Sequence, residues 1–242
     1  MILGIITARQ GSQGIPGKNM VDLGGRPLLD YTFALAEHSR RMDRVVLSTD
    51  MSDAIEWARR HYRRIDTPFT RPAHLAEAGS SSTDVVLHTV DFLEKEEGAH
   101  IEAIVLLQPT CPFREVIEVD GAIDLFRKKK LISLIGVSRV WHHPSDYVQR
   151  TSPEADSFRY MLRDPAWKRR QDFPEVWFIT GALYICRPEY LRQTGGFCDE
   201  RSYLYPMSEA TMVDIDSPFD LAIARGLVAT GAAGSIAHGG GK

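Results

Sequence analysis

The chain has 242 residues, a formal net charge of −3, and 43% hydrophobic against 25% charged residues. This composition is typical of a single globular domain, and the nearly balanced charge gives no reason to expect a nucleic-acid partner. No apolar run approaches the ~20 residues of a membrane span, and no cleavable leader precedes the first apolar run. We therefore expect a cytoplasmic protein without a membrane partner.

The N-terminal apolar run predicts a short buried strand that leads into a glycine-rich loop. Gly11, Gly14 and Gly17 let this loop turn tightly and bring backbone N–H groups close to a ligand. Arg9 and Lys18 flank the glycines and add two cations. Amide donors and cations together favour a phosphate as the ligand. The alternative is an ordinary strand-to-helix turn that happens to carry charges.

Two common phosphate-binding motifs do not fit this loop. A P-loop requires G-x-x-x-x-G-K followed by Ser or Thr, but the interval from Gly11 to Gly17 is one residue too long and Asn19 follows Lys18. The dinucleotide fingerprint G-x-G-x-x-G is absent, and Pro16 prevents a helix from starting inside the loop. A nicotinamide-dependent dehydrogenase is therefore disfavoured.

The next segments alternate between helices and strands. A turn at 21–27 precedes a helix that begins near Leu28. A second buried strand at 44–48 precedes a helix for which Asp50 or Ser52 is the expected cap. Both strands are short apolar runs, as expected for strands buried on both faces of a sheet.

The same alternation continues through the middle of the chain. The serines at 80–82 lead into a third helix, where their hydroxyls either cap the helix or bind a phosphate or ribose. A buried strand at 101–107 runs into the segment 108–114, and a fourth strand is expected at 131–137. This alternation predicts an α/β fold with a mainly parallel sheet covered by helices on both faces. The glycine loop, Asp50 and the segment 108–114 should then meet in one cleft at the carboxyl edge.

The alternation breaks at 141–170, which is expected to form an inserted arm on a single domain of residues 1–230. A further strand is expected at 178–186, and a helix at 217–228 closes the domain. The Gly- and Ala-rich tail at 231–242 is expected to be disordered.

A second polar signal precedes the closing helix. We expect a short strand at 211–216, in which Asp214 and Asp216 point to the same face. Two carboxylates without a basic neighbour in sequence suit Mg²⁺, which also takes phosphate oxygens and water. The alternative is a solvated turn in which Asp216 or Ser217 caps the helix. Asp220 is expected to serve the helix N-terminus.

The three cysteines, Cys111, Cys186 and Cys198, form no C-x-x-C pair, which predicts reduced thiols and neither disulfides nor a zinc site. No histidine or aspartate stands near Cys111 in sequence to act as a base. We therefore expect its sulfur to pack and not to react.

Several ordered blocks together resemble the acylneuraminate cytidylyltransferases, over roughly residues 2–228. These blocks are A-R-x-G-S-x-G-I-P-x-K-N in the glycine loop, L-Q-P-T-x-P-x-R at 107–114, H-H-P at 142–144 and D-I-D at 214–216. The related Kdo cytidylyltransferases carry a Leu-Pro-Gly-Lys-Pro run in the loop, so the acylneuraminate branch is favoured. The resemblance implies a Rossmann-like nucleotidyltransferase fold and a homodimer in which the arm reaches over the neighbour's active site.

The resemblance also implies a reaction: CTP and a nonulosonic, sialic-acid-like sugar give a CMP-sugar and pyrophosphate, with Mg²⁺ as cofactor. The residues it implies fall into four groups. The catalytic residues are Arg9, Lys18, Asp214 and Asp216; the nucleotide-binding residues are Ala8, Arg9, Gly11, Ser12, Lys18, Asn19, Arg71 and Ser82; the sugar-binding residues are Gln108, His143, Arg170 and Gln171; and the metal ligands are Asp214 and Asp216.

The chain departs from the family pattern at Thr180, where Asn is usual, at Ala78, where an acidic residue is common, and at Asp146, where some sialic-acid enzymes carry Lys. These departures leave the identity of the sugar acid open, and a different sugar or nucleotide is one alternative. Another is a relative that binds CTP without turning it over. The presence of Lys18, Asp214 and Asp216 argues against that second alternative.

Overall fold

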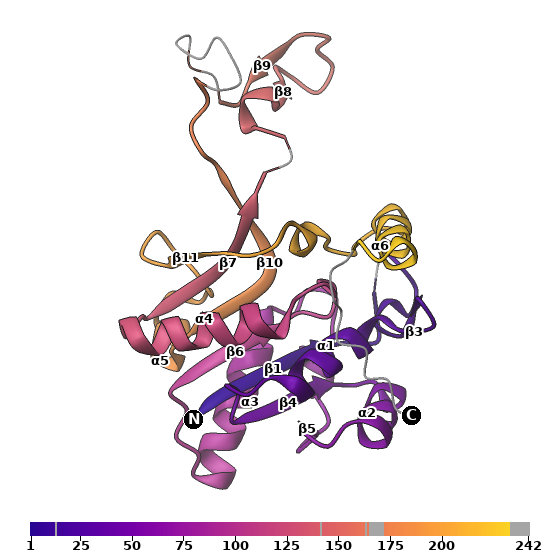
Figure 1. Ribbon diagram of the computed structural model, residues 1–242, viewed down its shortest axis with the longest axis vertical. Coiled ribbons are helices and arrows are strands. Elements are labelled where there is room, and N and C mark those ends of the chain that lie inside the picture. Colours follow the sequence, from indigo (N-terminus) through magenta and orange to yellow (C-terminus); the bar gives the residue numbers. More distant parts are fainter. Residues whose placement is uncertain (13, 141, 163, 165–171, 233–242) are drawn as a thin grey trace.

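A computed structural model describes residues 1–12, 14–140, 142–162, 164 and 172–232. Its centre is a seven-stranded sheet of order β11-β7-β10-β6-β1-β4-β5 (Figure 1). The strands are β1 (Ile2–Ala8), β4 (Arg44–Thr49), β5 (Ile65–Asp66), β6 (Ala103–Leu107), β7 (Ser133–Arg139), β10 (Trp177–Cys186) and β11 (Tyr203–Pro206). All neighbouring strands are parallel except β10, which runs antiparallel to both β6 and β7.

Helices pack on both faces of this sheet, as the sequence predicted. In β1, Ile2 and Ile6 belong to one buried cluster and Leu3 and Ile5 to another, because successive side chains of a strand point to opposite faces. The first cluster includes residues of α1 (Leu28–His38), α2 (Ser52–His61) and α4 (Val116–Lys129). The second includes residues of α3 (Ser82–Glu97) and α5 (Pro188–Thr194).

The closing helix α6 (Pro218–Thr230) begins as expected. Ser217 caps it, and the carboxylate of Asp220 accepts from the Ser217 backbone N–H at 2.7 Å, which completes a capping box. The helix packs in a third buried cluster that contains Phe113 and Ile215. This packing holds the segment before α6 against the carboxyl edge of the sheet.

The prediction of a strand at 211–216 is wrong. Residues Glu209–Met212 form a 3-10 helix, and 213–216 follow as extended chain outside any ladder. The edge position beside β7 is taken instead by β11, which the sequence analysis missed. Apolar and acidic residues alternate at 213–216 because Val213 and Ile215 are buried in the third cluster. The Ile215 N–H also donates to the Thr110 carbonyl at 2.9 Å.

The predicted cap of α2 is also wrong. The N-cap residue is Met51, which makes no side-chain capping bond. The side chain of Asp50 instead accepts a hydrogen bond from the Gln10 backbone N–H at 3.0 Å. Asp50 therefore stabilises the glycine loop and not the helix that follows it.

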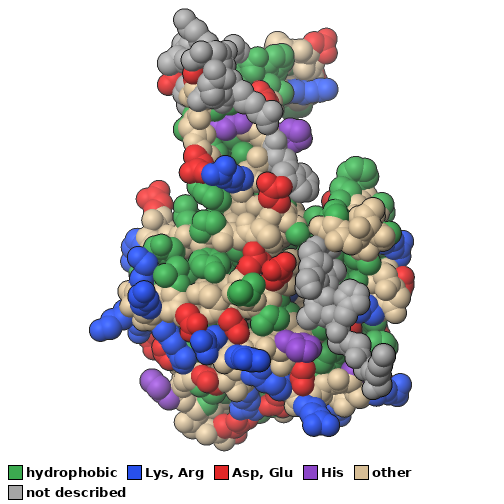
Figure 2. Space-filling view, viewed as in Figure 1, with side chains coloured by type: hydrophobic (Ala, Val, Ile, Leu, Met, Phe, Trp, Pro, Cys, Tyr) green, Lys and Arg blue, Asp and Glu red, His purple; other side chains and the backbone are tan. Residues whose placement is uncertain are grey.

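The arm rises from β7 and β10 away from the sheet (Figure 1). Its described part contains the 3-10 helix η3 (Pro144–Asp146) and an antiparallel hairpin of β8 (Val148–Arg150) and β9 (Phe158–Tyr160). Hydrophobic side chains lie on its surface and on the body below it (Figure 2). The part of the tail at 233–242 lies outside the described residues, so the predicted disorder there stays a prediction.

The remaining elements are short. They are the 3-10 helices η1 (Lys18–Met20) and η2 (Ala73–Leu75) and the two-stranded ribbon of β2 (Asp22–Leu23) and β3 (Arg26–Pro27). None of the helices in the described ranges is both long enough and apolar enough to cross a bilayer.

Candidate active site

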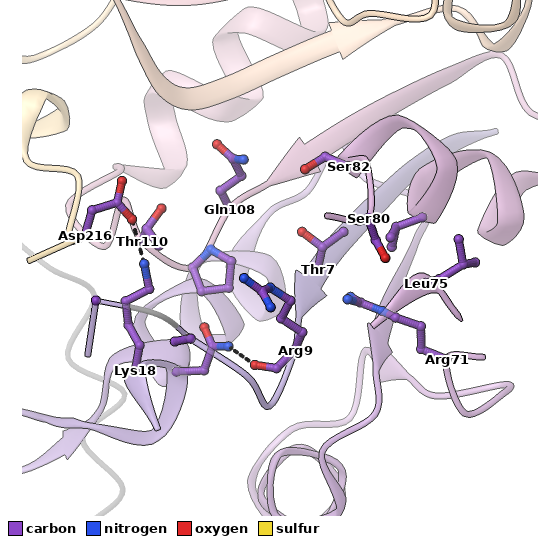
Figure 3. Close-up of a pocket in the computed structure, with 15 residues that line it drawn as sticks. Thr7, Arg9, Lys18, Arg71, Leu75, Ser80, Ser82, Gln108, Thr110 and Asp216 are labelled. Atoms are coloured by element: carbon purple, nitrogen blue, oxygen red, sulfur yellow. Dashed lines mark hydrogen bonds and ion pairs between the residues drawn. The ribbon is translucent and has the colours of Figure 1, made fainter. Parts of the chain in front are cut away.

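A cavity of about 420 Å³ opens at the carboxyl ends of β1 and β6, where ligands bind in sheets of this kind. It brings together most of the residues predicted for the site. Those that line it are Arg9, Ser12, Lys18, Asn19, Arg71, Ser82, Gln108 and Asp216. Figure 3 shows Lys18, Thr110 and Asp216 at one end of the cavity, Arg71 and Leu75 at the other, and Arg9 between them.

The glycine loop packs directly against the segment that carries the two aspartates. A Cβ atom at Gly14 would lie 2.1 Å from the backbone oxygen of Asp216, so only glycine allows this approach. Gly17 has φ of +63°, in the left-handed region, and precedes the short turn of helix that contains Lys18. These two glycines bring the lysine and the aspartate to the same place, although 198 residues separate them.

Lys18 Nζ and Asp216 Oδ1 form an ion pair at 2.6 Å (Figure 3). The lysine side chain is only 13% exposed, whereas that of Asp216 is 73% exposed. A mostly buried ammonium gains from a carboxylate partner because burial removes its hydration. A phosphate bound at this position would contact the same Lys18 ammonium.

Arg71 forms the opposite end of the cavity and is almost fully buried. Its Nε donates to Ser48 Oγ at 3.2 Å, and its Nη2 donates to the Ser48 carbonyl. Burial lowers the pKa of Arg71 to about 10, and the charge of Arg9 adds to that effect. Two arginines that repel each other across a cavity favour an anionic ligand between them.

The polar groups around the third helix divide into capping and lining roles. Ser81 is the N-cap of α3, and its hydroxyl accepts from the Thr83 backbone N–H at 3.1 Å. Ser80 and Ser82 line the cavity. The capping role is therefore confirmed for Ser81, whereas the binding of a phosphate or ribose by these serines stays a prediction.

Asp214, in contrast to Asp216, does not line the cavity and is half-buried. Burial raises the pKa of its carboxyl, while Thr110 and Lys18 act against that shift. The buried thiol of Cys111 donates to Asp214 Oδ1 at 3.7 Å, and burial raises the pKa of the thiol to about 12. A thiol with this pKa stays protonated at neutral pH, as expected for a packing residue and not a nucleophile.

Several predicted site residues are not placed in the cavity. Ala8 is buried at the end of β1, and Gly11 lies exposed in the loop outside the cavity lining. His143 lies in the arm, where its ring nitrogens contact Ser145 Oγ at 2.9 Å and the Pro174 carbonyl at 3.2 Å. Arg170 and Gln171 lie outside the described residues.

Thr7 and Thr110 line the cavity but were not predicted as site residues. Thr110 stands in a block that the sequence analysis singled out, so its place there was a usable signal. Thr7 directly follows the N-terminal apolar run, and its position near the carboxyl end of β1 brings it to the cavity.

Comparisons with known proteins agree with this geometry. A family model described as cytidylyltransferase matches residues 3–141. An N-acylneuraminate cytidylyltransferase of Streptococcus agalactiae is 31% identical over 89% of this chain and 50% of its own length. A CMP-N,N'-diacetyllegionaminic acid synthase of Legionella pneumophila is 28% identical over 94% of this chain and 96% of its own length. The chain thus spans about half the length of the N-acylneuraminate relatives and nearly all of the legionaminic acid relative.

Solved structures show the same fold. A CMP:2-keto-3-deoxy-manno-octonic acid synthetase complexed with CTP superposes with a TM-score of 0.67 at 17% identity, covering 95% of this chain and 99% of the other. A 4-diphosphocytidyl-2C-methyl-D-erythritol synthase from Anaerococcus prevotii gives a TM-score of 0.63 at 13% identity, with coverage of 94% and 96%. The predicted Rossmann-like fold is confirmed.

Proposed function

This chain belongs to the cytidylyltransferase family, and from that premise we propose that it transfers the cytidylyl group of CTP to a nonulosonic acid. The observation that carries the proposal is the convergence of Arg9, Lys18 and Arg71 on one cavity beside a glycine loop. A triphosphate matches this set of cations because it carries several negative charges along one chain. The names of two relatives, an N-acylneuraminate cytidylyltransferase and a CMP-N,N'-diacetyllegionaminic acid synthase, refer to acids of this class.

In the proposed reaction the anomeric hydroxyl oxygen of the sugar forms a bond to the α-phosphorus of CTP. The bond from that phosphorus to the β-bridging oxygen breaks, pyrophosphate leaves, and the hydroxyl proton passes to solvent. Such transfers depend on positioning and on charge neutralisation more than on covalent catalysis. In this proposal Lys18 stabilises the charge of the leaving pyrophosphate, and Arg9 binds the rest of the triphosphate.

We assign the nucleoside to the far end of the cavity, near Arg71 and Ser82. Ser12 is available to the phosphates, whereas Asn19 is already bonded to the Arg9 carbonyl and supports the loop. The backbone N–H of Gln10 is likewise bonded, to Asp50, so it is not one of the amides that would bind phosphate. Gln108 lies at the edge where the sugar would enter.

Asp214 and Asp216 fit a Mg²⁺ ion that is shared with the nucleotide. Their oxygens are hard ligands, and no third acidic, histidine or cysteine side chain completes a metal cluster with them in the described part of the chain. Mg²⁺ commonly takes one or two carboxylates and completes its shell with phosphates and water. When bound, the ion would supply charge neutralisation for the phosphates. Lys18 would then exchange its present contact with Asp216 for one with the nucleotide.

The arm supports a homodimer as the working form. Phe158 and Met161, in β9 and just after it, expose 55% and 66% of their surface, and Tyr160 and Leu162 beside them are exposed as well. Grouped exposed apolar residues mark an interaction surface. We propose that the arm packs on a second copy and there brings His143, Arg170 and Gln171 to the sugar of the neighbouring site. The three free cysteines are consistent with a cytoplasmic protein, which is the compartment we propose.

The test measures pyrophosphate release from CTP and Mg²⁺ with N-acetylneuraminic, legionaminic, pseudaminic and Kdo-type acids, and with GTP as the control nucleotide. Release that requires CTP, Mg²⁺ and one acid is the expected result, and it would also name the sugar. Equal release with GTP would contradict the nucleotide assignment. Binding of CTP without release for any acid would favour a CTP-binding protein that performs no transfer.

A further inference from the structure

The peptide bond between Arg9 and Gln10 is held from both sides by side chains of two other segments. Asn19 Nδ2 donates to the Arg9 carbonyl at 3.0 Å (Figure 3), and the Gln10 N–H donates to Asp50 Oδ1 at 3.0 Å. The carbonyl and the N–H belong to the same planar unit. Two hydrogen bonds on opposite edges of one plane fix its orientation.

Both partners of this peptide are themselves held in place. Asn19 is 6% exposed and lies in η1, with its amide also near the Met51 sulfur at 3.8 Å. Asp50 directly follows β4, in which Thr49 is paired with Ala8 at the end of β1. The clamp, defined here as Asp50 and Asn19 on the Arg9–Gln10 peptide, therefore ties the loop to the rigid sheet.

The orientation of this peptide matters because Arg9 comes immediately before it and lines the cavity. The residues that follow include Gly11 and Gly14, which restrict the backbone least of all residues. A free glycine-rich segment would have to be ordered by the ligand, and that ordering cost would reduce affinity. The clamp supplies the order before the ligand arrives.

The charge of Asp50 makes its location informative. It lies close enough to Arg71 that its charge opposes the lowering of the pKa of that guanidinium. A carboxylate so near a cavity for an anion costs binding energy if electrostatics alone is considered. The hydrogen bond of Asp50 to the loop offsets this cost, because an ordered loop favours binding of the anion.

We propose that Asp50, together with Asn19, is a positioning residue that preorganises the Arg9–Gln10 peptide for binding of the nucleotide triphosphate. Asp50 touches neither the nucleotide nor the reacting atoms in this assignment. The inference rests on the proposed function for the identity of the ligand, but the clamp itself exists without the ligand.

The first test compares CTP binding by calorimetry, without sugar, in Asp50→Ala and Asp50→Asn. The alanine variant is expected to bind CTP about tenfold more weakly, because a hydrogen bond to a charged group is lost. The asparagine variant keeps an acceptor oxygen and is expected to stay within about twofold of the unaltered protein. If electrostatics decides, both variants bind more tightly, and that result overturns the proposal.

A matched control removes the same charge nearby without touching the clamp. Asp53 is exposed in the first turn of α2, three positions after Asp50, and its carboxylate accepts a hydrogen bond from the adjacent Ala54 N–H. Asp53→Ala is expected to bind CTP as the unaltered protein does. A loss equal to that of Asp50→Ala would mean that helix charge, and not the clamp, is responsible.

The second test needs no ligand. Hydrogen exchange at the Gln10 amide is expected to accelerate in Asp50→Ala but to remain slow in Asp50→Asn and Asp53→Ala, because only the first loses the acceptor. Unchanged exchange in Asp50→Ala overturns the clamp. If the unaltered protein binds no CTP, the proposed function fails, and this exchange measurement still decides the clamp.

The third test asks whether the two side chains act as one unit. Asn19→Ala and Asp50→Ala each release one edge of the same peptide, so the double variant is expected to lose less affinity than the product of the two separate losses. Losses that multiply fully would show independent effects and contradict the clamp.

Discussion

The body and the arm of this protein differ in how their apolar side chains are buried. In the body, Ile5 and Val105 of neighbouring strands are fully buried between layers of helices from the same chain. In the arm, Phe158 and Met161 expose more than half of their surface, and the hairpin has only two strands. A two-stranded hairpin is marginal by itself in water. The body therefore folds on its own contacts, whereas the exposed apolar side chains of the arm are consistent with the proposed packing on a second copy.

The sharpest test of the body's independence is a large-to-small substitution in its core. Phe126 of α4 is 1% exposed in the larger buried cluster. Phe126→Ala is expected to lower the free energy of unfolding by about 3–5 kcal/mol, through lost burial and the cavity left behind. Urea unfolding measures this.

Phe158→Ala in the arm is the comparison. It is expected to change monomer stability by less than about 0.5 kcal/mol, because the side chain is mostly in contact with solvent. Similar losses for both phenylalanines would show that the arm is part of the folding core.

A second prediction concerns the proposed catalytic residue Lys18, whose loss should affect activity and not stability. Lys18→Ala is expected to lower kcat by about 10²–10³-fold, the cost of removing one preorganised charge from a developing anion. Unfolding in urea should change little, since the ion pair with Asp216 has a well-exposed partner. Lys128→Ala, in the exposed last turn of α4, is the control and is expected to keep full activity. An active Lys18→Ala protein would remove Lys18 from the mechanism.

A third prediction disrupts the proposed contact of the arm with a second copy and leaves the body unaltered. Met161→Glu is expected to shift the protein from dimer to monomer in analytical ultracentrifugation, because a charge then replaces an apolar contact at the proposed interface. The KM for the sugar should rise more than the KM for CTP, since in the proposed dimer the neighbour completes only the sugar site.

The control for this variant is a residue at the other end of β7, away from the arm. Ile132 is 39% exposed just before β7, and the arm follows the other end of that strand. Ile132→Glu is expected to leave the oligomeric state unchanged. Dissociation by both variants, or by neither, would argue against the arm as the contact.

The last prediction needs no mutation and has the smallest expected effect. It compares the burial of the three cysteines through their rates of chemical modification. Burial raises the pKa of both Cys111 and Cys186 to about 12, so at pH 8 both remain thiols in the folded protein. Because the thiolate is the reactive form, iodoacetamide is expected to modify Cys198, which is only partly buried, before either of them. Mass spectrometry of native and urea-unfolded samples measures this, and all three should react after unfolding. Rapid modification of native Cys111 would contradict its packing role.

Much of the body was predictable because its signals are local. The strands β1, β4, β6 and β7 appear in the sequence as short apolar runs, and the serines at 80–82 indicate the start of the third helix. The capping box at Ser217 and Asp220 also lies within four residues. Arg9, Lys18, Arg71 and Gln108, which the family resemblance implied as site residues, line one cavity.

The errors occurred where a local pattern has two structural solutions. Residues 213–216 alternate as a strand does, but a buried cluster satisfies the same alternation without a ladder. The edge of the sheet went to β11, whose exposed and partly buried residues give a weak signal. Asp50 looked like a helix cap because it precedes a helix, yet its carboxylate bonds to a loop 40 residues earlier.

The sequence by itself therefore determined the strand and helix alternation, the glycine loop and the residue types of the site, since periodicity and turn chemistry depend on neighbours in the chain. Only the tertiary structure decided that Lys18 contacts Asp216 and that Asn19 and Asp50 hold one peptide of the loop. It also set the antiparallel direction of β10. These contacts join segments that meet only after the sheet has assembled, and the hydrogen-bonding groups involved have many possible partners before then.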